Sequence, residues 1–213
     1  MITLKRSGNV QHIDLAKDLL KIGAVQIKTD DYFTWSSGIK SPIYCDNRLT
    51  MSYPAIRENI ANAFLTMIKE MDLRPDVIAG TATAGIPHAS WLSDRLQVPM
   101  VYVRSKPKGH GKGNQIEGAF QSGQNVLVIE DLISTGTSSI DAANALQDEG
   151  MNVLGVCAIF TYGLKEGQRQ FDEAGFEHYT LLSFDDILEL LLTEKRLSEN
   201  EAHELLRWRQ TLE

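Results

Sequence analysis

Two adjacent carboxylates, Glu130 and Asp131, follow four apolar residues and precede a run of hydroxyl side chains. The apolar residues, 126–129, are typical of a strand that helices cover on both faces. Burying two carboxylates at the end of such a strand is costly without partners. We therefore expect them to meet sugar hydroxyls or a hydrated cation at the carboxyl edge of an α/β sheet, where such folds bind ligands.

The hydroxyl run surrounds Gly136 and leads into a predicted helix over residues 140–149. Glycine lets backbone amides approach an anion, and a helix N-terminus adds partial positive charge. Ordinary helix capping is the alternative interpretation, but it leaves the adjacent carboxylates unexplained. The chain lacks the Gly-x-x-x-x-Gly-Lys-Ser/Thr sequence of an ATPase P-loop. The run predicts a phosphate site whose hydroxyls come from Ser134, Thr135, Thr137 and Ser138.

Residues 104–118 form a second segment that could take part in chemistry, because they are basic and rich in glycine. The segment is long for a connection within an α/β unit, which indicates either function or disorder. A cationic loop beside an anion site predicts a mobile lid that excludes water and stabilises a departing anion. A solvated charged loop is the alternative. The basic residues are Arg104, Lys106, Lys108 and Lys112, with His110 among them and no acid before Glu117.

The composition limits the class of protein. A chain of 213 residues with 43% hydrophobic residues suits a single domain with a substantial core. The net charge of −7 disfavours a nucleic-acid binder. The apolar runs are too short to span a bilayer, and the first residues lack the apolar core of a signal peptide, so we expect a cytoplasmic protein. Cys45 and Cys157 show no metal or redox spacing, and we expect both to be reduced and non-catalytic.

Strand patterns alternate with helix patterns along most of the chain, which predicts an α/β fold with an open, mainly parallel sheet and flanking helices. Short strands and turns are expected over residues 29–47. The strands of the sheet are predicted over residues 76–80, 99–104, 125–131, 152–162 and 178–184. Helices are predicted over residues 13–22, 53–71, 86–96, 140–149, 164–174, 185–197 and 199–211, the last beginning with a capping box at Ser198.

The acidic pair and the hydroxyl run resemble the signature of the type I phosphoribosyltransferases, which bind 5-phosphoribosyl 1-diphosphate. The resemblance implies that Glu130 and Asp131 hold the ribose hydroxyls. It also implies that the 5′-phosphate lies in the loop, so the donor contacts are carried by Glu130, Asp131, Leu132, Ile133, Ser134, Thr135, Gly136, Thr137 and Ser138.

The basic segment narrows this resemblance. Its pattern, Arg-x-x-x-Lys-x-His-Gly followed by Ile-Glu-Gly, is similar to the catalytic loop of the orotate phosphoribosyltransferases. That family transfers phosphoribose to N1 of orotate and gives orotidine 5′-monophosphate and diphosphate. The resemblance implies a Mg²⁺ ion held mainly by substrate and water. It also implies a homodimer in which the loop reaches the neighbouring active site. The implied catalytic residues are Arg104, Lys108, His110 and Asp131.

The resemblance covers the remaining substrate contacts as well. Residues 80–87 form a small-residue turn, where Thr81 and Ala82 are implied to meet diphosphate. A tight strand-to-helix connection is the alternative interpretation of this turn. Residues 1–50 are implied to form a hood over the base, within a single domain of residues 1–213. The implied orotate contacts are Tyr44, Ser134 and Tyr162.

Some positions depart from the family pattern. Tyr162 and Ser36 stand where some members carry a cation, and Ala84 stands where others carry a lysine. The sequence leaves open which residue supplies the missing positive charge around orotate. Two other functions also stay open: a phosphoribosyltransferase for another base, and a non-catalytic regulator that senses phosphoribosyl diphosphate.

Overall fold

The computed structural model describes residues 10–34, 38–106 and 115–212 of the chain. They form one six-stranded sheet, two smaller two-stranded sheets and the helices packed around them. Among the described residues, no helix is both long and apolar enough to cross a membrane. The expected α/β fold with an open, mainly parallel sheet is confirmed.

The central sheet has the strand order β10-β9-β8-β5-β6-β7. Neighbouring strands are parallel, except that β7 runs antiparallel to β6. Because β5 and β8 are parallel neighbours, their carboxyl ends lie side by side at one edge of the sheet. The strands are β5 (Val77–Thr81), β6 (Met100–Val103), β7 (Ile116–Glu117), β8 (Asn125–Ile133), β9 (Asn152–Thr161) and β10 (His178–Ser183).

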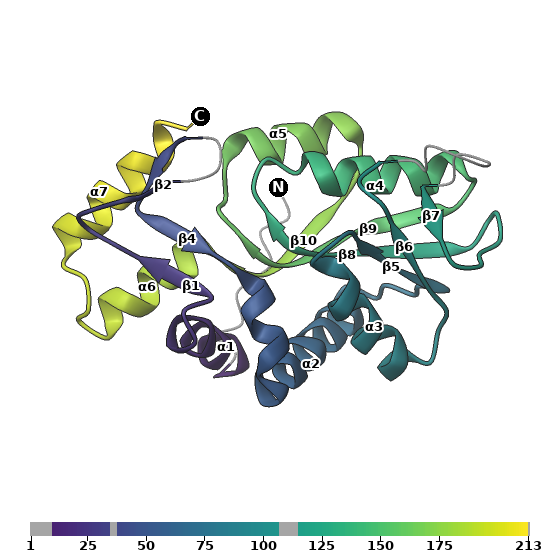
Figure 1. Cartoon of the computed structure of the whole chain (residues 1–213), viewed down its shortest axis with the longest axis horizontal. Coiled ribbons are helices and arrows are strands. Elements are labelled where there is room, and N and C mark those ends of the chain that lie inside the picture. Colours follow the sequence, from purple (N-terminus) through teal and green to yellow (C-terminus); the bar gives the residue numbers. More distant parts are fainter. Residues whose placement is uncertain (1–9, 35–37, 107–114, 213) are drawn as a thin grey trace.

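Helices cover both faces of this sheet, as Figure 1 shows. Two of them, α4 and α5, lie on the upper face in that view, and α1, α2 and α3 lie on the lower face. The last two helices pack at the side that carries the small N-terminal sheets. The helices are α1 (Val10–Lys21), α2 (Pro54–Glu70), α3 (Gly85–Leu96), α4 (Thr137–Asp148), α5 (Lys165–Ala174), α6 (Phe184–Thr193) and α7 (Glu199–Gln210).

The N-terminal segment forms two antiparallel ribbons, β1 with β4 and β2 with β3, and then a 3-10 helix, η1. The C-terminal helix holds this segment in place, because Trp208 Nε1 in α7 donates a hydrogen bond of 2.9 Å to the carbonyl of Lys40. The C-terminal helix α7 therefore contacts the N-terminal ribbons directly. The elements are β1 (Val25–Ile27), β2 (Phe33–Thr34), β3 (Lys40–Ser41), β4 (Ile43–Cys45) and η1 (Asn47–Ser52).

Alternate residues of β8 pack into two separate parts of the core. Val126 and Val128 belong to the cluster that includes α4 and α5, and Leu127 belongs to the cluster that includes α1, α2 and α3. This explains why the strand is apolar at every position, since helices bury both of its faces. It also fixes where the next side chains point, because Glu130 continues the α4 side of the strand.

The predicted elements are found with small shifts at their ends. Helix α4 begins at Thr137 rather than at residue 140, because Gly136 serves as its N-cap and the hydroxyl residues form its first turn. Strand β8 continues to Ile133, two residues past its expected end. The two-residue strand β7 was not predicted and lies within the segment expected to be a loop. The capping box at Ser198 is confirmed.

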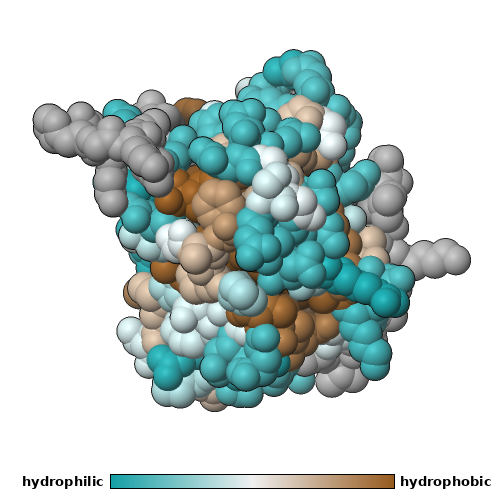
Figure 2. Space-filling view, turned by 90° about the vertical axis from the view of Figure 1, so that its right-hand side faces the viewer, coloured by the Kyte–Doolittle hydropathy of each residue, from teal (hydrophilic) through white to brown (hydrophobic). Residues whose placement is uncertain are grey.

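The described surface carries few large apolar side chains. Figure 2 shows that the side at the right of Figure 1 mixes hydrophilic areas with smaller hydrophobic ones. Three of the exposed large side chains gather in or directly after η1, at the carboxyl edge of the sheet. Such a gathering is typical of a contact surface. Among the described residues, the exposed large hydrophobic side chains are Ile13, Ile39, Leu49, Met51 and Tyr53.

His88 is an unusual polar residue inside this core. It lies on α3, is 2% exposed, and packs edge-on against the ring of Trp91 with centroids 5.2 Å apart. Its Nδ1 atom is buried without a hydrogen-bond partner. Burial lowers the pKa of His88 to about 4, because the charged imidazolium would lose its hydration there.

This burial predicts a loss of stability in acid. The unfolded chain binds a proton at His88 near its ordinary pKa of 6.5, whereas the folded chain does so only at about 4. Stability from this residue is therefore complete above 6.5 and falls as the pH drops toward 4, by about 3 kcal/mol. We expect His88→Phe to remove that part of the pH dependence in urea unfolding at several pH values. The exposed His203→Gln should keep the wild-type profile, and equal slopes in all three proteins would contradict the prediction.

Candidate functional site

The acidic pair lies at the carboxyl end of β8, with its two side chains on opposite faces of the strand. Glu130 is 5% exposed and accepts hydrogen bonds of 3.3 Å each from the hydroxyls of Ser138 and Ser139 at the start of α4. It also accepts a hydrogen bond of 3.0 Å from the backbone amide of Asp131. The carboxylate of Glu130 is thus held from two directions, and Asp131 is the more open member of the pair.

Both carboxyl groups are harder to ionise than ordinary acids. Burial raises the pKa of Glu130, and the neighbouring charge of Asp131 raises it further. Burial also raises the pKa of Asp131, while its hydrogen bonds and the charge of Arg48 oppose that effect. A bound cation or a set of hydroxyl donors would stabilise the charged forms. The pair is therefore suited to a polyhydroxylated ligand or a hydrated metal ion.

The hydroxyl-rich loop between β8 and α4 is shaped by α5. Gly136 has φ of +84°, and a Cβ atom there would lie 2.7 Å from the ring of Phe171. A Cβ atom on Gly167 would lie 2.7 Å from the carbonyl of Ser134. Because the N-cap of α4 is a glycine, no side chain caps its first turn. The first turn of α4 is therefore open to a ligand with acceptor groups, and the phosphate that the sequence predicts there stays a prediction.

The turn after β5 lies beside this loop, since β5 and β8 are neighbours. A Cβ atom on Gly85 would lie 2.3 Å from the carbonyl of Ile129, so only glycine lets α3 approach β8 this closely. Among the described residues, the buried hydroxyl of Thr81 has no hydrogen-bond partner. The Ala82 amide donates 2.9 Å to the carbonyl of Val103. Contact of Thr81 and Ala82 with diphosphate stays a prediction.

The N-terminal segment reaches the same edge through Asn47, a residue that the sequence analysis missed. Its side chain is fully buried and donates a hydrogen bond of 2.7 Å from Nδ2 to the carbonyl of Asp131. Within the part of the chain that the structure describes, the buried Oδ1 atom of Asn47 has no hydrogen-bond partner. In the sequence, Asn47 stands in an Asp-Asn-Arg stretch after a short strand. No local periodicity there indicates a contact with a residue 84 positions away.

Tyr44 and Tyr162, the expected aromatic contacts, lie near this anchor. Tyr44 is half-buried and packs against Phe33, with ring centroids 5.6 Å apart. Tyr162 is 5% exposed and follows β9 directly. Burial raises the pKa of the Tyr162 hydroxyl, and Coulombic interactions with Cys45, Tyr44 and Asp131 raise it further. The structure therefore brings Tyr162 into the neighbourhood of the acidic pair and the N-terminal segment.

The basic segment is described only at its two ends. Arg104 is half-buried, and its Nη1 lies 3.4 Å from the carboxylate of Glu117 on β7. Its backbone amide donates 2.9 Å to the carbonyl of Gln115, so the ends of the expected loop form a ribbon. Lys108 and His110 lie outside the described residues, as does Ser36. The placement of these side chains against the anion site stays a prediction.

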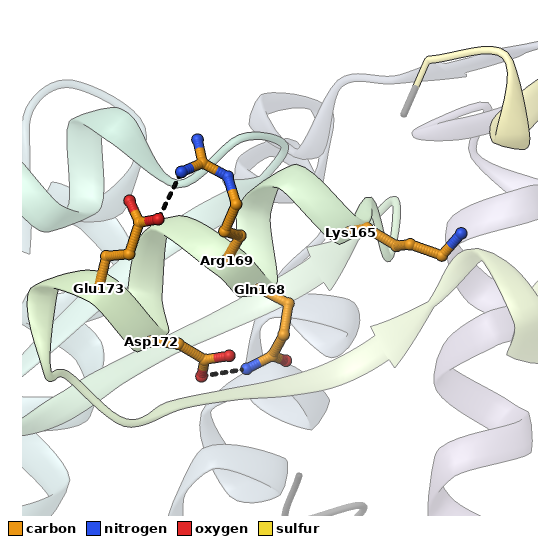
Figure 3. A pocket seen from close by; sticks show the side chains of 5 residues that line it. All are labelled: Lys165, Gln168, Arg169, Asp172 and Glu173. Carbon is orange, nitrogen blue, oxygen red and sulfur yellow. Dashed lines mark hydrogen bonds and ion pairs between the residues drawn. The ribbon is translucent and has the colours of Figure 1, made fainter.

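A shallow hollow lies on α5, and Figure 3 shows the side chains that line it. Its side chains pair along one helix face: Arg169 with Glu173, and Gln168 with Asp172 at 2.8 Å. Paired charges on an exposed helix are typical of a solvated surface. The hollow is lined by Lys165, Gln168, Arg169, Asp172 and Glu173, none of which the sequence analysis assigned to a ligand.

Comparisons with known proteins agree on one family. Residues 50–184 match the family described as Phosphoribosyl transferase domain. The orotate phosphoribosyltransferase of Oceanobacillus iheyensis is 61% identical over 198 residues, which is 93% of this chain and 98% of that protein. The match to the family spans the acidic pair, the hydroxyl-rich loop and the basic segment.

Solved structures give the same result. The orotate phosphoribosyltransferase of Aeropyrum pernix has a TM-score of 0.74 and 31% identity, covering 83% of this chain and 97% of that one. A UMP synthase from Leishmania donovani has a TM-score of 0.79 and 26% identity. The match covers 97% of this chain and 43% of that longer one.

The buried Asn47 contact makes a prediction about stability. Asn47→Ala removes the bond to the Asp131 carbonyl and leaves a cavity, so we expect the free energy of unfolding to fall by about 2 kcal/mol. The matched control is Asn59→Ala, because Asn59 is exposed and its side chain donates a hydrogen bond of 3.2 Å to Asp18. Urea unfolding should show a change of less than about 0.5 kcal/mol for the control. Similar losses in both variants would contradict an anchoring role for Asn47.

Proposed function

The chain belongs to the orotate phosphoribosyltransferase family, and from this premise we propose the reaction that it catalyses. The phosphoribosyl group of 5-phosphoribosyl 1-diphosphate passes to N1 of orotate, giving orotidine 5′-monophosphate and diphosphate for pyrimidine biosynthesis. The observation that carries this proposal is the acidic pair shortly before a helix N-terminus that has no side-chain cap. The pair suits ribose hydroxyls, and the helix start suits a phosphate.

The donor would lie along the edge formed by β5 and β8. Its 5′-phosphate would accept hydrogen bonds from the amides and hydroxyls of residues 134–138, with Leu132 and Ile133 lining the approach. Its ribose hydroxyls would meet Glu130 and Asp131. The raised pKa values of these acids support this assignment, because donors at the carboxylates would replace hydration lost on burial.

The reaction is expected to require Mg²⁺. When bound, the ion would neutralise charge on the diphosphate as it leaves. Glu130 and Asp131 are the residues suited to hold it through their carboxylates. Among the described residues, no group of three acidic, His or Cys side chains is placed to hold a metal. An ion that takes most of its ligands from substrate and water is compatible with this arrangement.

Departure of diphosphate would leave positive charge on the ribose carbon. The carboxylate of Asp131 would stabilise that charge, and the backbone amides near Ala82 would neutralise the leaving group. Arg104, Lys108 and His110 are proposed to neutralise the diphosphate from the basic segment. Arg104 would exchange its 3.4 Å contact with Glu117 for the anion. Orotate, once deprotonated at N1, attacks directly without a covalent enzyme intermediate.

The proposal extends to a homodimer whose basic segment serves the neighbouring active site. The exposed apolar residues Leu49, Met51 and Tyr53 support a subunit contact close to the site. We also propose a cytoplasmic location. The two free cysteines, Cys45 and Cys157, are compatible with a reducing compartment.

The first test follows the absorbance of orotate. We expect the signal to fall only when protein, phosphoribosyl diphosphate and Mg²⁺ are all present, because donor, acceptor and ion act in one step. Omitting Mg²⁺ or adding a chelator should reduce the rate by at least about 100-fold, the scale of losing a major charge stabiliser. Turnover of adenine or hypoxanthine instead of orotate would contradict the proposed acceptor. Binding of the donor with no diphosphate release from any base would indicate a regulator.

The shared loop predicts complementation between inactive subunits. Lys108→Ala should lower kcat by about 100-fold or more while orotate still binds, because the lysine acts on the leaving group. Asp131→Ala should be inactive because it lacks the carboxylate proposed to meet the ribose. Mixing the two proteins under conditions of subunit exchange should restore up to about a quarter of wild-type activity, since a mixed dimer has one intact site. Mixtures no more active than their parents would contradict a loop that crosses the interface.

A further inference from the structure

The proposed acceptor carries a carboxylate, and this group needs a positive partner. The described groups around the proposed base site are Tyr44, Tyr162 and the acidic Asp131. None of these three is a cation, and Asp131 would repel the acceptor. A desolvated carboxylate without a cationic partner is costly, so a charged side chain must approach from another element. This reasoning rests on the proposed function.

Arg48 lies directly after the anchored Asn47 and is exposed at the start of η1. Asp46 binds the guanidinium on one side: Nε and Nη2 of Arg48 lie 2.6 and 2.8 Å from the two carboxylate oxygens. A guanidinium has five N–H donors, and these contacts engage one edge of the group. The opposite edge stays able to bind a second carboxylate in the bidentate manner that arginine favours.

The position of Arg48 is fixed relative to the acidic pair. Its backbone neighbour Asn47 is tied to Asp131 by the 2.7 Å bond, and Asp46 restricts the guanidinium to one orientation. Less side-chain entropy is therefore lost when a ligand binds. The charge of Arg48 also reaches the site, because it is among the groups that lower the pKa of the Asp131 carboxyl against the effect of burial.

Three other described cations near the hood or the basic segment have contacts of their own. The ammonium of Lys40 donates 2.8 Å to the hydroxyl of Thr34. Lys28 lies over the ring of Phe33, 4.7 Å from its centroid, and contacts Asp31. Arg104 is on the far side of β5, next to β7. Arg48, by contrast, is tied to the strand of Asp131 through its neighbour Asn47.

We propose that Arg48 binds the carboxylate of the acceptor and so selects orotate over neutral pyrimidines. The Asp46 carboxylate orients the guanidinium, and the bond from Asn47 to Asp131 sets its distance from the reacting ribose. Arg48 would supply the positive charge that the sequence lacks at Ser36 and Tyr162. The residue makes an acceptor contact and takes no part in bond breaking.

The test compares two nucleotides that differ only in this carboxylate. Orotidine 5′-monophosphate and uridine 5′-monophosphate are titrated by calorimetry into wild-type protein and Arg48→Gln. We expect the wild type to prefer orotidine 5′-monophosphate, and the variant to lose about 10- to 100-fold of that preference, the scale of a charge-assisted hydrogen bond. Affinity for uridine 5′-monophosphate should change less than about threefold, since its contacts are shared. Arg48→Lys should retain part of the preference, because it keeps the charge but loses the fork.

Arg74→Gln is the matched control. Arg74 is also exposed and also pairs with an aspartate two positions earlier, at 3.1 Å, but it lies before β5 at the opposite edge of the sheet. It should keep the wild-type preference. An Arg48→Gln protein that keeps this preference would overturn the proposed role of Arg48. The proposed reaction on orotate would still stand. A wild type that neither prefers orotidine 5′-monophosphate nor consumes orotate would overturn the proposed function itself.

Discussion

The site is organised by the need to bury two adjacent carboxylates at the end of β8. Glu130 is 5% exposed and depends on Ser138 and Ser139 for hydrogen bonds, so α4 must begin close beside it. Asp131 is held through its backbone by Asn47, so the N-terminal segment must reach the same edge. A buried strand could not supply these hydrogen bonds alone, so both come from other parts of the chain.

Tight packing behind the site keeps these groups in place. Gly85 brings α3 against the backbone of β8, and Gly136 and Gly167 bring α5 against the hydroxyl-rich loop. In each place a single methyl group would collide with a main-chain or ring atom. The anion site is therefore a product of helix packing as much as of its own sequence, because the loop cannot move without displacing α5.

The sequence predicted the sheet, the helices and the position of the acidic pair near the end of β8, because these depend on local patterns. Apolar strands, a capping box at Ser198 and acids before hydroxyls are all read within a few residues. Long-range contacts left no such pattern. Nothing near Asn47 indicates that it reaches Asp131, and nothing near Ala82 indicates that its amide is taken by Val103. Assignments that depend on free amides or partners across the fold therefore required the structure.

An acidic protein that binds anionic substrates must separate its charges in space. The net charge is −7, yet two carboxylates of the site are buried and raised in pKa, which limits their repulsion of a phosphate. Positive charge arrives from outside the sheet, through Arg48 on η1 and Arg104 at the base of the basic segment. Each of these arginines is paired with an acid in the free protein. Arg48 would keep its contact with Asp46 when it binds a substrate anion, so less reorganisation opposes binding there, whereas Arg104 would exchange Glu117 for the anion.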